Sequence, residues 1–209
     1  MTGQNRSSAV MQQRREPPDS LDYFPTPPWA TRALLTHVIP YADGVCWEPA
    51  CGEGHMARPL AEHFPRVLAS DIFDYGFGEV RDFLAGPGQL LQEPDPACDW
   101  IITNPPFKCG DDFILRALSV ARRGVAMIVR TAFTEGVERY NRLWLPHPPY
   151  VVAQFVERVV ILKGRLAQPD EGTATAYCWI VWDRLADRAP YTWIPPCRKA
   201  LERPEDYRQ

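Results

Sequence analysis

Short apolar runs alternate with longer amphipathic or polar segments through most of the chain. The runs with the most branched and aromatic side chains are 45–48, 67–72, 100–103 and 125–129. Runs of this length and composition are typical of strands buried on both faces of a parallel sheet. Between the last two, residues 113–122 carry apolar side chains at helical spacing, and Gly124 closes this segment. The pattern therefore predicts strands that alternate with helices.

The remaining segments extend this alternation. The elements expected there are helices over 29–38, 55–63 and 135–145, a short strand before Arg81, and two long strands over 151–162 and 175–182. Thr26 is the expected N-cap of the first helix, with Pro27 and Pro28 in its first turn. Alternating strands and helices followed by a closing hairpin predict an α/β fold. We expect a seven-stranded, mostly parallel sheet with a terminal antiparallel β-hairpin.

Composition divides the chain into one domain with a tail at each end. Residues 1–19 are polar and aperiodic and are expected to be disordered, residues 20–189 form a single domain, and residues 190–209 form a C-terminal tail. No apolar run approaches the ~20 residues of a membrane span, and the polar N-terminus does not resemble a signal peptide. The six cysteines form no CxxC pair. We therefore expect reduced thiols in a cytoplasmic protein, with neither a metal nor a membrane as partner.

The loop Asn104-Pro105-Pro106-Phe107 directly follows the expected strand 100–103. Ligands of open α/β sheets bind beyond the carboxyl ends of the strands, so this loop falls where a site is expected. Each proline fixes its φ and lacks an N–H, which leaves backbone carbonyls available as acceptors beside the Asn104 amide. These acceptors and the ring face of Phe107 indicate a pocket for a planar nitrogenous group. The alternative is an ordinary turn, in which Asn and Pro are common.

A glycine-containing turn, Glu48-Pro49-Ala50-Cys51-Gly52-Glu53-Gly54, follows the strand 45–48. Gly52 and Gly54 let the backbone approach a ligand closely and tolerate positive φ. The helix expected next would present backbone N–H groups to a carboxylate. The chain contains neither a GxGxxG fingerprint nor a P-loop, so the turn indicates a ligand site of another kind.

Acidic residues follow two more of the expected strands. Asp71, with Ile72 after it, comes 23 positions after Glu48. Folds of the α/β class place a carboxylate at this point to bind both hydroxyls of a ribose. Asp82 and Phe83 follow the third strand, where the ring could stack on an adenine whose amino group donates to Asp82. The alternative in each case is an acid that follows a strand by chance.

Charge is distributed unevenly along the chain. The whole sequence has a net charge of −3, but residues 104–165 contain ten cations and five acids. This positively charged segment, which includes the loop 104–107, favours a phosphate backbone as partner. The residues expected to bind the substrate are Phe107, Lys108, Arg139, Arg142, Lys163 and Arg165. The alternative is that these cations are scattered over solvated helix faces.

Together, these segments resemble those of class I S-adenosylmethionine-dependent methyltransferases, and specifically the amino-methyltransferases with the signature (Asn/Asp/Ser)-Pro-Pro-(Tyr/Phe/Trp). The likeness covers about Tyr23 to Arg184. The glycine turn precedes the catalytic loop, as in the γ arrangement of DNA adenine-N6 methyltransferases. The closing segments 155–158 and 176–179 look like those of small phage and prophage enzymes. A separate target-recognition domain of the usual size is missing, so sequence specificity must come from loops or be low.

The resemblance implies a Rossmann-like class I methyltransferase fold with S-adenosylmethionine as cofactor. It implies that the cofactor is bound by Phe24, Thr26, Pro27, Glu48, Pro49, Ala50, Cys51, Gly52, Gly54, Asp71, Ile72, Asp82, Phe83 and Asn104. The catalytic residues it implies are Asn104, Pro105, Pro106 and Phe107. His55 and His63 are interpreted as structural, because the reaction needs no dedicated base.

The reaction implied is methyl transfer to an exocyclic amino nitrogen, with adenine N6 of DNA as the leading substrate. Related loops of this signature also serve RNA adenine or guanine N-methylation and methylation of the glutamine side-chain amide of a protein. A third class is a cofactor-binding module without catalysis, against which the intact Asn104 loop argues.

Overall fold

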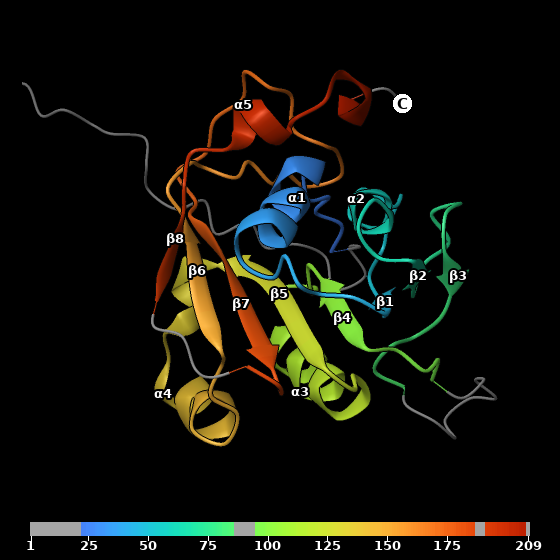
Figure 1. Cartoon of the computed structure of the whole chain (residues 1–209), viewed down its shortest axis with the longest axis vertical. Helices are drawn as coiled ribbons and strands as arrows, with labels where there is room; N and C mark the ends of the chain where they lie inside the picture. Colours follow the sequence, from blue (N-terminus) through green and yellow to red (C-terminus); the bar gives the residue numbers. More distant parts are fainter. Residues whose placement is uncertain (1–21, 86–94, 187–190, 208–209) are drawn as a thin grey trace, which may run out of the picture.

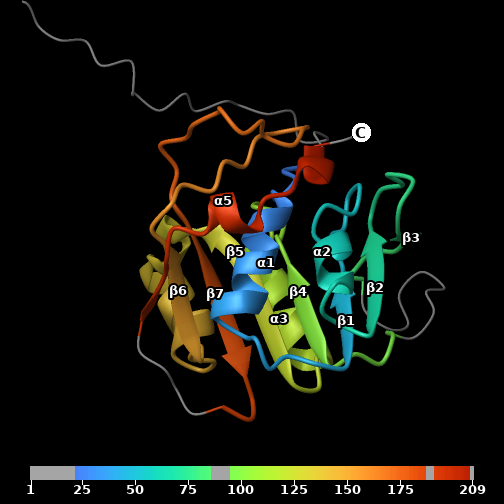
Figure 2. The same cartoon turned by 45° about the horizontal axis from the view of Figure 1, so that its top comes forward.

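The computed structural model describes residues 22–85, 95–186 and 191–207. The tail expected over 1–19 and most of the loop between 86 and 97 lie outside these ranges. The described residues form one eight-stranded sheet with helices on both faces, as Figure 1 and Figure 2 show. In these ranges no helix combines the length and the apolar character needed to cross a membrane.

The strands lie in the order β3-β2-β1-β4-β5-β7-β6-β8. Their bounds are β1 Val45–Glu48, β2 Arg66–Asp71, β3 Glu79–Val80, β4 Trp100–Thr103, β5 Gly124–Arg130, β6 Val151–Phe155, β7 Tyr177–Asp183 and β8 Thr192–Ile194. Strands β1 to β5 pair in parallel, β7 runs antiparallel to β5 and β6, and β8 pairs in parallel with β6. The chain leaves β1 in one direction along the sheet and returns to β4 on its other side. The ends of β1 and β4 therefore form a topological switch point, where such sheets bind ligands.

Side chains of the central strands alternate between two hydrophobic layers. Successive residues of β5, from Val125 to Val129, point to opposite layers, and β4 is buried along its whole length. One layer is covered by the helices α1 Pro28–His37, α2 Ala57–Ala61 and α5 Arg198–Leu201. The other is covered by α3 Gly110–Val120 and the π-helical turn η2 Tyr140–Trp144. Burial on both faces explains why these strands are apolar runs rather than alternating ones.

The expected fold class is confirmed, and each of the seven expected strands is present, but several boundaries differ. The helices expected over 55–63 and 113–122 are α2 Ala57–Ala61 and α3 Gly110–Val120. The strand expected to reach Leu162 ends at Phe155, because residues 159–161 bury their side chains in an irregular segment. The helix expected from Glu135 begins after Gly136, whose φ is +113°, as α4 Val137–Arg139.

The first helix also begins one residue earlier than expected. Its N-cap is Pro27, and Thr26 makes no capping hydrogen bond. Thr26 is instead 2% exposed and belongs to the site described below.

Residues 191–207, which composition assigns to a tail, pack against the domain. Strand β8 adds an eighth strand beside β6, and η3 Pro204–Tyr207 follows α5. The side chain of Arg32 in α1 is 8% exposed and donates to the Asp206 carboxylate at 2.7 and 2.9 Å, and to the Leu201 carbonyl at 2.9 Å. The same guanidinium donates to Glu62 after α2 at 2.8 and 3.0 Å. A buried arginine thus ties the C-terminal segment to the domain, which local composition does not reveal.

Candidate active site

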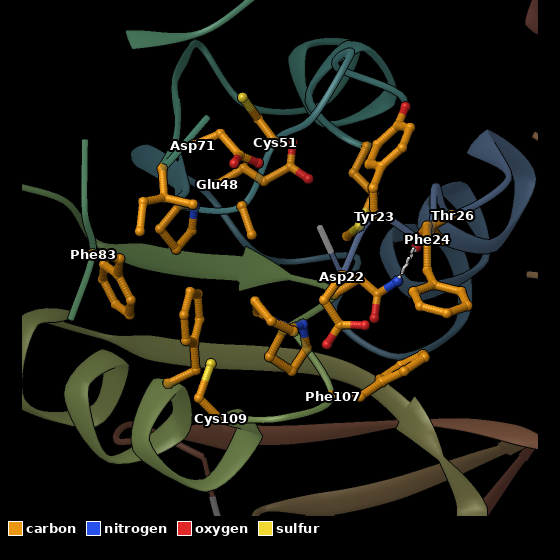
Figure 3. A pocket seen from close by; sticks show the side chains of 18 of the residues that line it. Asp22, Tyr23, Phe24, Thr26, Glu48, Cys51, Asp71, Phe83, Phe107 and Cys109 are labelled. Atoms are coloured by element: carbon orange, nitrogen blue, oxygen red, sulfur yellow. Dashed lines mark hydrogen bonds between the residues drawn. The ribbon is translucent and has the colours of Figure 1, made fainter. Parts of the chain in front are cut away.

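A cavity of about 300 Å³ lies at the switch point of the sheet. Its walls come from the segment before α1, the turn after β1, the ends of β2 and β3, and the loop after β4. Figure 3 shows these side chains around the cavity, with Glu48 and Asp71 close together on one side and Phe107 at another end. The cavity therefore lies at the strand ends where the sequence predicts a ligand site.

Asn104 is held in one orientation by the segment before α1. Its Nδ2 donates to the Phe24 carbonyl at 2.9 Å and to the Thr26 hydroxyl at 3.1 Å. With both donors used, the Oδ1 atom is left buried and without a hydrogen-bond partner among the described residues. An unsatisfied buried acceptor is costly, and one that lines a cavity is suited to a donor on a ligand. Asn104 can therefore accept a hydrogen bond from an amino group.

Glu48 presents a second unsatisfied acceptor. The residue is 1% exposed, and its Oε2 atom has no partner within the described part of the chain. Burial raises the pKa of Glu48 well above its usual range, the nearby Asp71 carboxylate raises it further, and the backbone N–H of Ala57 acts in the opposite direction. A carboxyl group in this state gains most from a ligand that brings a positive charge.

Asp71, the last residue of β2, holds the glycine turn that follows β1. Its Oδ2 accepts from the backbone N–H of Gly52 at 2.9 Å, and its Oδ1 accepts from that of Phe73 at 3.1 Å. Burial raises the pKa of Asp71, and the backbone donors act against this rise. Each carboxylate oxygen can accept a further hydrogen bond, so Asp71 can still bind hydroxyl groups of a ligand. Gly52 has a φ of +50°, and a Cβ there would lie 2.5 Å from the Tyr23 ring.

The segment 22–26 lines the cavity and contacts both the glycine turn and the Asn104 loop. Tyr23 stacks on Tyr75, with 4.6 Å between the ring centroids, and its carbonyl accepts from the N–H of Gly164 at 2.9 Å. At its start, the Asp22 carboxylate accepts from the backbone N–H of Lys108 at 3.3 Å. This segment therefore contacts three parts of the chain that are far apart in sequence.

The far end of the cavity is apolar. Phe83 lines it but is only 3% exposed, because Trp47 and Phe113 pack on its ring at centroid distances of 5.2 and 4.9 Å. Ile72 lines the same end and is 65% exposed. Ile72 can therefore offer more surface to a flat apolar group than Phe83 can.

Most of the site residues expected from the sequence line this cavity. Those that do are Phe24, Thr26, Glu48, Pro49, Ala50, Cys51, Asp71, Ile72, Asp82, Phe83, Asn104, Pro105, Pro106, Phe107 and Lys108. Pro27, Gly52 and Gly54 are not among its lining residues. The sequence reasoning missed Tyr23 and Tyr75, although each lies beside or near a residue that it singled out. It also interpreted His55 as structural, whereas His55 lines the cavity, and burial lowers the pKa of this residue.

Of the cations expected to bind a substrate, Lys108 lines the cavity, whereas Arg139, Arg142, Lys163 and Arg165 are not among its lining residues. Arg139 and Arg142 pair with Asp111 and Asp112, the two acids in the first turn of α3, and the Arg139 contact measures 2.7 Å. Arg165 pairs with Glu171. These three arginines are thus paired with acids, which lie 28 and 30 positions away in sequence for Arg139 and Arg142 and 6 positions away for Arg165.

Lys163 and Arg165 nevertheless lie in the loop whose Gly164 bonds to Tyr23. Both residues are therefore close to the segment that covers the cavity. No cluster of His, Cys, Asp or Glu side chains in the described ranges has the arrangement of a metal site.

No protein-family model matches the chain. Among curated proteins, it is 29% identical over 147 residues to ribosomal RNA small subunit methyltransferase C of Klebsiella pneumoniae, a match that covers 65% of this chain and 42% of that protein. Among solved structures, it is similar to a Listeria monocytogenes protein assigned as a class I S-adenosylmethionine-dependent methyltransferase, with a TM-score of 0.57 at 10% identity, covering 84% of this chain and 67% of the other. It is also similar to the methyltransferase subunit of a type I restriction-modification system from Streptococcus thermophilus, with a TM-score of 0.55 at 10% identity and coverage of 79% and 45%. The chain thus matches less than half the length of the curated relative.

The fold is that of class I S-adenosylmethionine-dependent methyltransferases, as expected from the sequence. The similar solved structures of this fold include a protein assigned as an S-adenosylmethionine-dependent methyltransferase.

Proposed function

We propose that this protein is an S-adenosylmethionine-dependent methyltransferase that modifies an exocyclic amino nitrogen, with adenine N6 of DNA as its substrate. The observation that carries the proposal is the Asn104 side chain. Its amide is fixed by two hydrogen bonds, its Oδ1 is buried with no hydrogen-bond partner among the described residues, and the residue lines the cavity. Methyl transfer to an amine is favoured by a hydrogen-bond acceptor held in place beside the nitrogen that gains positive charge.

The residues of the cavity fit the cofactor. The unsatisfied Oε2 atom of Glu48 suits the ammonium group of the methionine portion, and Asp71 suits the ribose hydroxyls. The apolar end near Ile72 and Phe83 suits the adenine ring. When bound, S-adenosylmethionine supplies an electrophilic methyl group on a sulfonium.

The catalytic loop would act mainly through hydrogen bonding and stacking. Adenine N6 is a poor nucleophile because its lone pair is delocalised into the ring. Oδ1 of Asn104 and the carbonyl of Pro105 accept from its two N–H bonds, which directs the lone pair and stabilises the positive charge that develops on nitrogen. Phe107 stacks on the extruded base, since the nitrogen is out of reach inside a duplex. The methylated ammonium then loses its proton to water.

Two lines of support favour a nucleic acid over a protein amide. Residues 104–165 carry a net positive charge even though part of it is paired. The similar proteins include a ribosomal RNA methyltransferase and a subunit of a restriction-modification system. RNA is the second candidate substrate, and the curated relative is the observation that favours it.

The proposal is tested by offering labelled cofactor to duplex DNA, to RNA and to a glutamine-containing protein in parallel. We expect label in DNA, recovered as N6-methyladenine after digestion to nucleosides. Label in RNA alone would establish the second candidate, and label in protein alone would reject the nucleic-acid substrate.

Asp71→Ala is expected to weaken cofactor binding at least tenfold. The change removes a charged acceptor and releases the N–H of Gly52, and the loss of such a partner costs about 1.5–3 kcal/mol. Isothermal titration calorimetry measures the affinity. Asp43→Ala is the matched control, because Asp43 also accepts from the backbone of a glycine, Gly44, but does not line the cavity. Unchanged affinity in a folded Asp71→Ala protein would remove Asp71 from the site.

Cofactor affinity is expected to decrease as the pH is lowered from neutral. The pKa of Glu48 is raised in the ligand-free protein, and an ammonium group favours its ionised form, so binding releases a proton and low pH opposes it. Titrations at several pH values should show this slope, and Glu48→Gln should abolish it. His55→Ala should retain the slope, which excludes a contribution from His55, a cavity residue whose pKa is lowered by burial. A wild-type affinity independent of pH would contradict the assignment.

A further inference from the structure

Arg130 lies at the end of β5, directly beside the ring of Phe107. Its guanidinium carbon is 4.3 Å from the centroid of that ring, while the Phe24 ring also contacts Phe107 at a centroid distance of 4.5 Å. A base that stacks on Phe107 would lie against a face of the Phe107 ring, at a distance similar to that of the Arg130 guanidinium. The guanidinium is planar, so it covers the aromatic surface much as a base would.

Arg130 differs from the other arginines near the catalytic loop in its charge environment. Arg139, Arg142 and Arg165 each face a carboxylate. Within the described ranges Arg130 has no carboxylate partner, and it is exposed. Its other neighbour is the buried Tyr177, opposite it in β7, where burial raises the pKa of the hydroxyl and Arg130 acts against this rise.

From this juxtaposition we infer that Arg130 binds the phosphate of the extruded nucleotide and occupies the place of the base on Phe107 until the nucleotide arrives. The inference rests on the proposed function and specifies how the site holds its substrate. An exposed cation–π contact is weaker than the stacking of a base on an aromatic ring, so an incoming base can displace the guanidinium. The displaced guanidinium has no carboxylate partner within the described ranges and can form a bidentate contact with a phosphate.

Arg122 provides a matched control at the other end of the same strand. It is exposed and lies just before β5, so Arg122→Ala removes the same charge at the opposite edge of the sheet. Any effect that depends only on the net charge of the protein should be equal in the two variants.

The experiment compares Arg130→Ala, Arg130→Lys and Arg122→Ala as full-length proteins, using mixed-sequence DNA and RNA and labelled cofactor. We expect Arg130→Ala to raise KM for the nucleic acid about tenfold and to reduce the salt slope by about one unit. The turnover number and cofactor affinity should change little, and Arg130→Lys should restore the salt slope because it restores the charge. Arg122→Ala should behave as the wild type.

Two results would overturn the inference. Equal effects of Arg130→Ala and Arg122→Ala would reduce Arg130 to a general surface charge. A lower KM in Arg130→Ala would mean that the side chain only obstructs the ring and binds no phosphate. Failure of the proposed function itself would be recognised separately, because the wild-type protein would then label neither DNA nor RNA.

Discussion

Asn104→Ala is expected to lower the turnover number about 100- to 1,000-fold, the usual effect of losing one preorganised electrostatic partner. The contact between Oδ1 and the attacking amino group strengthens as positive charge develops on nitrogen. Its loss therefore acts mainly on the chemical step. Single-turnover methylation with saturating cofactor measures this step. A wild-type rate with the cofactor bound would show that the loop is only a turn.

The Asn104 side chain has a second, structural role, and a matched variant separates the two effects. Nδ2 of Asn104 also anchors the segment 22–26, through Phe24 and Thr26, so Asn104→Ala removes an anchor as well as an acceptor. Thr26→Val removes one anchor and leaves Oδ1 in place. We expect Thr26→Val to weaken cofactor binding and to affect the chemical step much less. Equal loss of the single-turnover rate in both variants would assign the effect to the segment and not to the acceptor.

Arg32→Ala is expected to lower the free energy of unfolding by about 3–5 kcal/mol. The Asp206 side chain is 5% exposed, and without Arg32 its charge would be buried with no compensation from this guanidinium. Urea denaturation followed by circular dichroism measures the change. Amide hydrogen exchange should also become faster in α5 and η3, because Arg32 binds both the Leu201 carbonyl and Asp206.

Arg203→Ala is the control for this prediction. Arg203 also pairs with Glu62, but its side chain is 49% exposed, so its removal should cost about 0–1 kcal/mol. The double variant Arg32→Ala/Asp206→Asn should recover part of the stability lost by Arg32→Ala, because no unpaired charge is then buried. A single-variant cost equal to that of Arg203→Ala would show that the C-terminal segment is held by other contacts.

The sequence by itself determined the fold class and the position of the site. Strands β1, β4 and β5 can be recognised in the sequence as short runs of branched and aromatic side chains. Both faces of each strand are buried, and this constraint acts on every residue of the run. The Asn104 loop and the glycine turn are visible because prolines and glycines restrict or free the backbone locally. These properties depend on neighbours in sequence, so a pattern can report them.

Only the tertiary structure decided how the side chains of the site are used. Oδ1 of Asn104 is the unsatisfied atom because Phe24 and Thr26, about 80 positions earlier, take both donors of Nδ2. Arg139 and Arg142 are paired because the first turn of α3 brings two acids to them across about 30 positions. The C-terminal segment packs on the domain because Arg32 meets Asp206, 174 positions later. Each contact joins residues of ordinary type that no local periodicity relates, so their pairing follows from the fold and cannot be read from the chain.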